Sequence, residues 1–173
     1  MRTVRQKVFK FSELSDDAKQ KAIDWYRDGE DYCFLGDNIV SDAKEVGLKI
    51  ISLDDYRANH GEFINSATIT AEACINNHGN TCETYKEAEK FLIEKSDLVK
   101  KYSDGVDVEQ VSEDNEYEFD KEFDELEADF LHDLLECYRI MYNDQVDYQN
   151  SDEYVTENLI LNEYEFTQDG KIF

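Results

Sequence analysis

The chain has 173 residues, of which 40% are hydrophobic and 13% aromatic, which suffices for the core of one domain and excludes global disorder. Its net charge of −24 argues against direct binding to nucleic acid or to an anionic membrane, and it favours basic protein surfaces as partners. The charge is uneven, since residues 1–101 carry 15 Lys and Arg against 19 Asp and Glu, whereas residues 102–173 carry 3 against 23.

Two strands and two helices are predicted in the first third of the chain. The segment TVRQKVFKF predicts a strand over residues 3–11. Ser15 is a good N-cap for a helix that ends at Gly29. Apolar residues at helical spacing predict a second helix over residues 35–46, which a glycine ends, and LKIISL predicts a strand over residues 48–53.

The middle of the chain has one ambiguous segment and one clear helix. Residues 54–64 indicate a loop or a short hairpin. Residues 66–79 fit a helix by their Ala and Cys spacing, although a Thr-Ile-Thr run favours a strand, and we choose the helix. A helix is predicted from residue 81 to about residue 102. Residues 103–115 lack a periodic pattern and are expected to be a charged connector.

The last third predicts a long amphipathic helix over residues 118–147, a short helix over 151–162 and a hairpin over 163–173, where an Asp-Gly pair favours the turn. The terminal strands are expected to pair. The predicted fold is α+β, with four or five helices and a small antiparallel sheet from the termini and residues 48–53. A single domain is expected, with a possible division into residues 1–101 and 102–173.

Apolar residues of the long helix form a stripe, since Phe119, Phe123, Leu126 and Phe130 are spaced by four, three and four residues. These rings are expected in the core, because nucleic acid that might stack on them is repelled. Trp25 is expected in the core as well.

The cysteines are scattered, and no apolar stretch approaches a transmembrane span or the apolar part of a signal peptide. We therefore expect free thiols in a reducing cytoplasm rather than a disulfide framework. The four positions are Cys33, Cys74, Cys82 and Cys137.

Several segments resemble a family of small accessory proteins encoded by bacteriophages and prophages. The resemblance lies in the opening FSELSDDAKQKAIDWYR, the middle segments DAKEVGLKI, GEFINSA and NNHGNTCETYKEAEKFL, and the ending NEYEFTQDGK. It covers most of the chain outside about residues 100–120 and carries no activity or functional residue over to this sequence. It implies a phage protein that acts in the cytoplasm of a bacterial host, where such proteins often disarm defences.

One group of residues suggests metal chemistry. Cys74, His78 and Cys82 are spaced by four residues, as soft-metal ligands on one helical face would be. Gly79 is expected to break the helix between them, and a fourth ligand is not evident. The sequence has no P-loop, no GxGxxG, no GxSxG and no calcium-loop pattern. We expect no enzyme, no cofactor and no metal, and a zinc site or an enzyme built on this group stays a remote alternative.

Residues 112–131, SEDNEYEFDKEFDELEADFL, contain ten acids and Lys121 as the only base. Carboxylates four residues apart on a helix repel each other, and each such pair costs roughly 0.2–0.5 kcal/mol. Mixed charges would give solubility with less repulsion, so the pattern favours a partner that supplies Lys and Arg. The predicted like-charge pairs are Glu118–Glu122, Asp120–Asp124, Glu125–Asp129 and Asp129–Asp133.

If this stretch is helical throughout, its negative charges average one per roughly 3.3 Å of helix axis. This spacing is close to that of the phosphates along one DNA strand, which is about 3.4 Å. We therefore predict a non-enzymatic inhibitor that imitates nucleic acid and binds the basic surface of a host defence protein, such as a CRISPR effector or a restriction nuclease. A merely solubilising face, and an acidic adaptor that homodimerises through the long helix, remain open. The predicted partner-binding residues are Glu113, Asp114, Glu116, Glu118, Asp120, Glu122, Asp124, Glu125, Glu127, Asp129 and Asp133.

Overall fold

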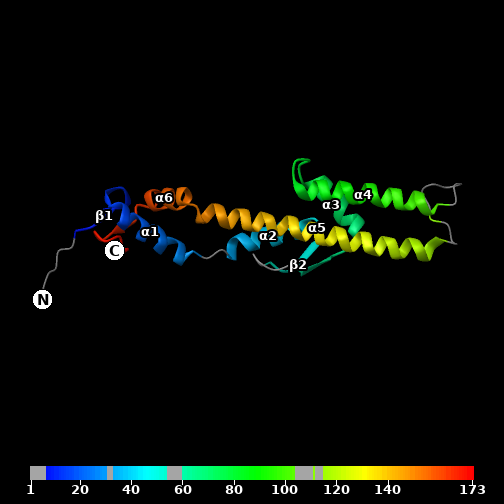
Figure 1. The fold of residues 1–173 in the computed structure, drawn as a ribbon, viewed down its shortest axis with the longest axis horizontal. Coiled ribbons are helices and arrows are strands. Elements are labelled where there is room, and N and C mark those ends of the chain that lie inside the picture. The colour runs from blue at the N-terminus through cyan, green and yellow to red at the C-terminus, as the bar shows by residue number, and fades with distance from the viewer. Residues whose placement is uncertain (1–6, 31–32, 54–59, 104–110, 112–114) are drawn as a thin grey trace. The chain divides into compact units, whose positions relative to one another are not determined.

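The computed structural model describes residues 7–30, 33–53, 60–103, 111 and 115–173 (Figure 1). These residues form an α+β fold, as predicted, with six α-helices where four or five were expected. The predicted long helix is α5 (Glu116–Asn150), and the ambiguous segment near residue 70 is helix α3 (Ala67–Asn77).

The chain groups into two compact units. One unit contains Met1–Phe34 together with Asp144–Phe173, and the other contains Leu35–Asn143. This grouping differs from the expected division after residue 101, because the two ends of the chain share one core while most of α5 belongs to the other unit.

The first unit joins the two ends of the chain. Strand β1 (Phe9–Lys10) pairs antiparallel with β4 (Glu165–Phe166), and the predicted pairing of the terminal strands is confirmed. A 3-10 turn, η1 (Phe11–Glu13), leads into helix α1 (Asp16–Gly29), and helix α6 (Asp152–Leu161) packs against α1. Each of the two helices begins at a serine whose hydroxyl accepts a backbone N–H, which satisfies a group that the first turn leaves unpaired.

The core of the first unit is small, and Trp25 lies at its edge. Phe166 is fully buried and contacts Phe11 edge to face at a ring distance of 6.5 Å. Trp25 contacts Tyr164 and Phe166 edge to face at 5.5 and 6.3 Å, yet 37% of Trp25 is exposed. The expectation that Trp25 is a core residue is therefore wrong in part, since one side of the ring packs and the other meets solvent.

The chain ends in the predicted Asp-Gly turn. Gly170 has φ +83°, and its N–H donates to the carbonyl of Thr167 at 3.0 Å. A Cβ at this position would lie 2.2 Å from the Ala18 carbonyl oxygen, so both the backbone angle and the close approach to α1 require glycine.

The second unit contains helix α2 (Cys33–Glu45, from Leu35 onward), the hairpin strands β2 (Leu48–Ser52) and β3 (His60–Phe63), helix α3 and helix α4 (Glu83–Tyr102). Leu48 is paired with Phe63 in the antiparallel register. The expected single sheet is wrong, because β2 pairs with β3 rather than with the terminal strands.

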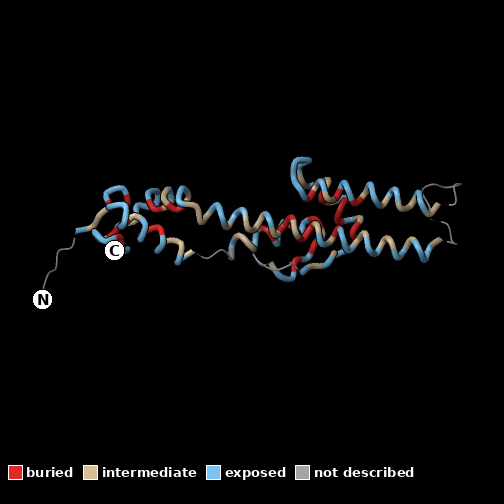
Figure 2. The backbone as a smooth tube through the Cα atoms, in the orientation of Figure 1, coloured by how far each residue is buried: buried red, intermediate tan, exposed pale blue. Residues whose placement is uncertain are grey.

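Aromatic rings form the centre of the second unit. Figure 2 shows buried residues along the inner sides of α3, α4 and α5. The Phe130 ring of α5 stacks on Phe91 of α4 at 4.5 Å and on Phe63 of β3 at 5.7 Å. Leu134 and Tyr138, one and two turns further along α5, are fully buried in the same cluster. This packing fixes which side of α5 faces inward.

Candidate functional site

Nine of the eleven predicted partner-binding residues lie in the first half of α5. Glu113 and Asp114 fall outside the described residues. The helix extends from Glu116, so the charged segment is helical where the structure describes it. The nine residues are Glu116, Glu118, Asp120, Glu122, Asp124, Glu125, Glu127, Asp129 and Asp133.

The apolar stripe of α5 packs against α4. Phe130 is buried with 4% exposure, and Phe123 and Leu126 are partly buried against the same cluster. Phe119 stacks on Phe123 at 5.5 Å and contacts Tyr102 of α4 at 6.3 Å. In this fold the chain itself covers the surface that the adaptor alternative would use for homodimerisation.

The inward stripe separates the nine acids into two flanks, because successive residues of a helix turn by about 100°. The first flank adjoins α4 and carries Glu118, Glu122, Glu125, Asp129 and Asp133. The second flank, on the opposite side of the stripe, carries Glu116, Asp120, Asp124 and Glu127. The structure therefore brings the predicted residues together as two groups and not as one face.

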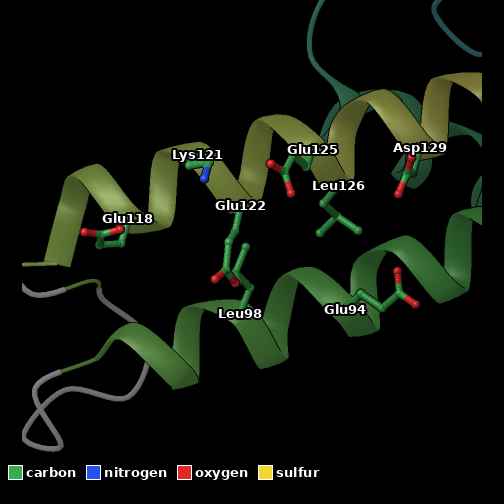
Figure 3. Close-up of a pocket in the computed structure, with 8 residues that line it drawn as sticks. All are labelled: Glu94, Leu98, Glu118, Lys121, Glu122, Glu125, Leu126 and Asp129. Carbon is green, nitrogen blue, oxygen red and sulfur yellow. The ribbon is translucent and has the colours of Figure 1, made fainter.

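The first flank borders a hollow of about 470 Å³ between α4 and α5 (Figure 3). Leu98 of α4 and Leu126 of α5 lie between the helices there, and Lys121 is the only cation among the described residues of the lining. Sequence analysis missed the acid that α4 contributes, since nothing in one helix reveals which residue of another helix faces it. The lining carboxylates are Glu94, Glu118, Glu122, Glu125 and Asp129.

Two first-flank acids are paired with lysines of α4. The Lys101 ammonium donates to both oxygens of Glu122 at 2.7 and 2.6 Å, and the Tyr102 hydroxyl donates to the same carboxylate at 2.8 Å. Lys90 donates to Asp133 at 3.1 Å. The hydrogen bond from Lys101 lowers the pKa of Glu122, and the bond to Asp133 raises the pKa of Lys90. The fold itself therefore supplies a counter-charge for these two acids.

The other first-flank acids, Glu118, Glu125 and Asp129, are exposed and make no ion pair with any residue that the structure describes. The same holds for Lys121, although it lines the hollow with them. Glu127, on the second flank, is partly buried, and desolvation raises the pKa of its carboxyl. Three acids of the first flank and Glu94 thus line the hollow without an ion pair to any described residue.

The predicted agreement with phosphate spacing depends on counting both flanks together. Along the first flank, acids recur every three or four residues, which is about 4.5–6 Å at a rise of ~1.5 Å per residue. One DNA strand carries a phosphate per about 3.4 Å of axis. The charges on one flank are therefore sparser than phosphates, so the flank does not reproduce the charge spacing of a DNA strand.

The Cys74/His78/Cys82 group is separated by the end of α3. Cys74 is fully buried in that helix, whereas Cys82 is the exposed N-cap of α4. The His78 ring lies 2.7 Å from the Thr84 hydroxyl through Nδ1 and 3.5 Å from the Asp42 carboxylate through Nε2. Both ring nitrogens thus have protein partners, which ties α2, the end of α3 and the start of α4 together.

The buried thiols are poor nucleophiles. Burial raises the pKa of both Cys74 and Cys137 to about 12, so each stays protonated near neutral pH. Tyr138 donates to Asp42 at 3.0 Å and completes the polar group around His78. Sequence analysis missed this contact because Asp42 and Tyr138 lie 96 residues apart. The hydrogen bonds of this polar group join different helices, as in a network that stabilises the fold.

Three further observations bound the candidate site. None of the helices in the described part of the chain combines the length and the apolar character needed to cross a membrane. Within the same residues, no three His, Cys, Asp or Glu side chains are arranged to hold a metal ion. In comparisons with known proteins, the chain matches no family model, no curated protein and no solved structure.

Proposed function

We propose that the protein is a non-enzymatic binding protein whose α5 first flank docks on the basic, nucleic-acid-binding surface of another protein. The observation that supports this most is the hollow beside α4, where Glu118, Glu125 and Asp129 have no cationic partner in the described chain. In the setting that the sequence resemblance implies, the partner is a bacterial defence protein such as a CRISPR effector or a restriction nuclease.

Electrostatics supplies the selectivity of this interaction. At 4 Å, two opposite unit charges attract by about 1 kcal/mol in bulk water and by about 4 kcal/mol near a protein surface. A cationic groove brings several such contacts at once and accelerates the encounter at low salt. A nucleic acid is repelled by the same negative charges, so the protein binds a nucleic-acid-binding protein and not the nucleic acid itself.

The hollow adds shape to the charge. Arg and Lys carry long apolar stems below their charged heads, and these stems pack readily on apolar surface. Leu98 and Leu126 provide such surface between the acidic walls (Figure 3). A Lys or Arg side chain of the partner would therefore make both ionic and apolar contacts in this hollow.

A lysate capture experiment with two matched variants tests the proposal. The first-flank variant combines Glu118→Gln, Glu125→Gln and Asp129→Asn, and leaves the Glu122 and Asp133 ion pairs intact. The second-flank variant combines Glu116→Gln, Asp120→Asn and Asp124→Asn, and removes the same charge from the other side of the stripe. Each tagged protein is incubated with bacterial lysate, and retained proteins are identified by mass spectrometry.

We expect the wild-type protein and the second-flank variant to retain a basic nucleic-acid-binding protein that the first-flank variant loses. Added duplex DNA or RNA should release this partner, because both ligands use one surface. If all three proteins retain the same set, or if the partner holds its nucleic acid and this protein together, the proposal is wrong. Equal capture with lower solubility of both variants would identify the acids as a solubilising face.

A further inference from the structure

We draw no further inference here: the strongest candidate, the apolar groove of about 360 Å³ that Ile75 of α3 and Leu92 and Ile93 of α4 line, has a rim of mixed charge, and nothing in the described residues shows what covers it.

Discussion

Helices α4 and α5 pack their apolar sides together, yet the charges of α4 are balanced whereas α5 is strongly acidic. α4 holds five acids and five bases, and three of its lysines pair with an acid three residues earlier in the same helix. α5 holds twelve acids and two bases. Both helices have solvated outer sides, so solubility and packing are compatible with a balanced surface. The acidic excess of α5 therefore calls for an explanation beyond the fold.

The ion pairs between the two helices refine this contrast. Lys101 pairs with Glu122, and Lys90 pairs with Asp133. Between them, α4 contributes Glu94, an acid, to the hollow. The helix that could have neutralised the middle of the first flank instead adds to its charge. Glu122 and Asp133 are thus compensated by α4, whereas Glu118, Glu125 and Asp129 on the same flank make no ion pair with any described residue.

The largest expected effect concerns the shared apolar contact. Phe130→Ala should lower the free energy of unfolding by roughly 3–5 kcal/mol, because it removes a buried ring that stacks on Phe91 and Phe63. Phe119→Ala should cost clearly less, since Phe119 is only partly buried. Urea unfolding followed by circular dichroism measures both. Equal, small losses would show that the stripe is not a core contact.

A smaller effect is expected for two acids of α5, whose contributions to the stability of the fold should depend on pH with opposite signs. The pKa of Glu122 is lowered by the hydrogen bond from Lys101, so its ionised form stabilises the fold above the unfolded-state pKa. That contribution is lost as pH falls through the folded-state pKa. Glu122→Gln should therefore be less stable than wild type near pH 7, and the difference should narrow toward about pH 3.

Glu127 should behave in the opposite way. Burial raises its pKa, so ionisation in the folded state is unfavourable and stability falls as pH rises through that pKa. Glu127→Gln should be slightly more stable than wild type near pH 7 and equal to it at about pH 3, below the ordinary Glu range. Thermal melting at the two pH values checks the pair of variants. A shift of the same sign for both would contradict the contrast between a paired and a desolvated carboxylate.

The smallest expected effect is a gain in binding. Of the residues that the structure describes, Lys121 is the one cation that lines the hollow, so Lys121→Gln should strengthen the attraction for a cationic probe such as a nona-arginine peptide. One unit charge at ~10 Å in water corresponds to about 0.4 kcal/mol, or about a twofold gain in affinity. Fluorescence anisotropy at low salt measures it. Unchanged or weaker binding would show that the probe does not sit near this hollow.

Much of the fold follows from local sequence signals. Serine caps, glycine stops and helical spacing predict α1, α4, α5 and α6, and the terminal strands pair as their alternating residues indicate. Strand β3 lies in the segment for which the sequence leaves both a loop and a short hairpin open, because HGEF has a weak strand pattern and becomes a strand through its pairing with β2. Trp25 was misplaced because an aromatic ring at the edge of a small core is buried on one side only.

The candidate site was predictable in composition but not in geometry. The sequence shows the acids of α5 and its apolar stripe. Because the stripe is expected to pack inward, it predicts that the acids face solvent. It does not show that α4 lies alongside, that Lys101 and Lys90 pair with Glu122 and Asp133, or that Glu94 joins the hollow. These contacts join residues that are 21 and 43 positions apart, so they depend on how the two helices meet.

The most direct measurement is the salt dependence of affinity between the captured basic partner and three proteins: wild type, the first-flank variant and the second-flank variant. Loss of Glu118, Glu125 and Asp129 charge should weaken binding by about tenfold or more at low salt and flatten the slope of log affinity against log salt. The second-flank variant should stay close to wild type in both quantities. Equal losses in the two variants would mean that only net charge matters, and unchanged binding in the first-flank variant would contradict a docking role for the hollow.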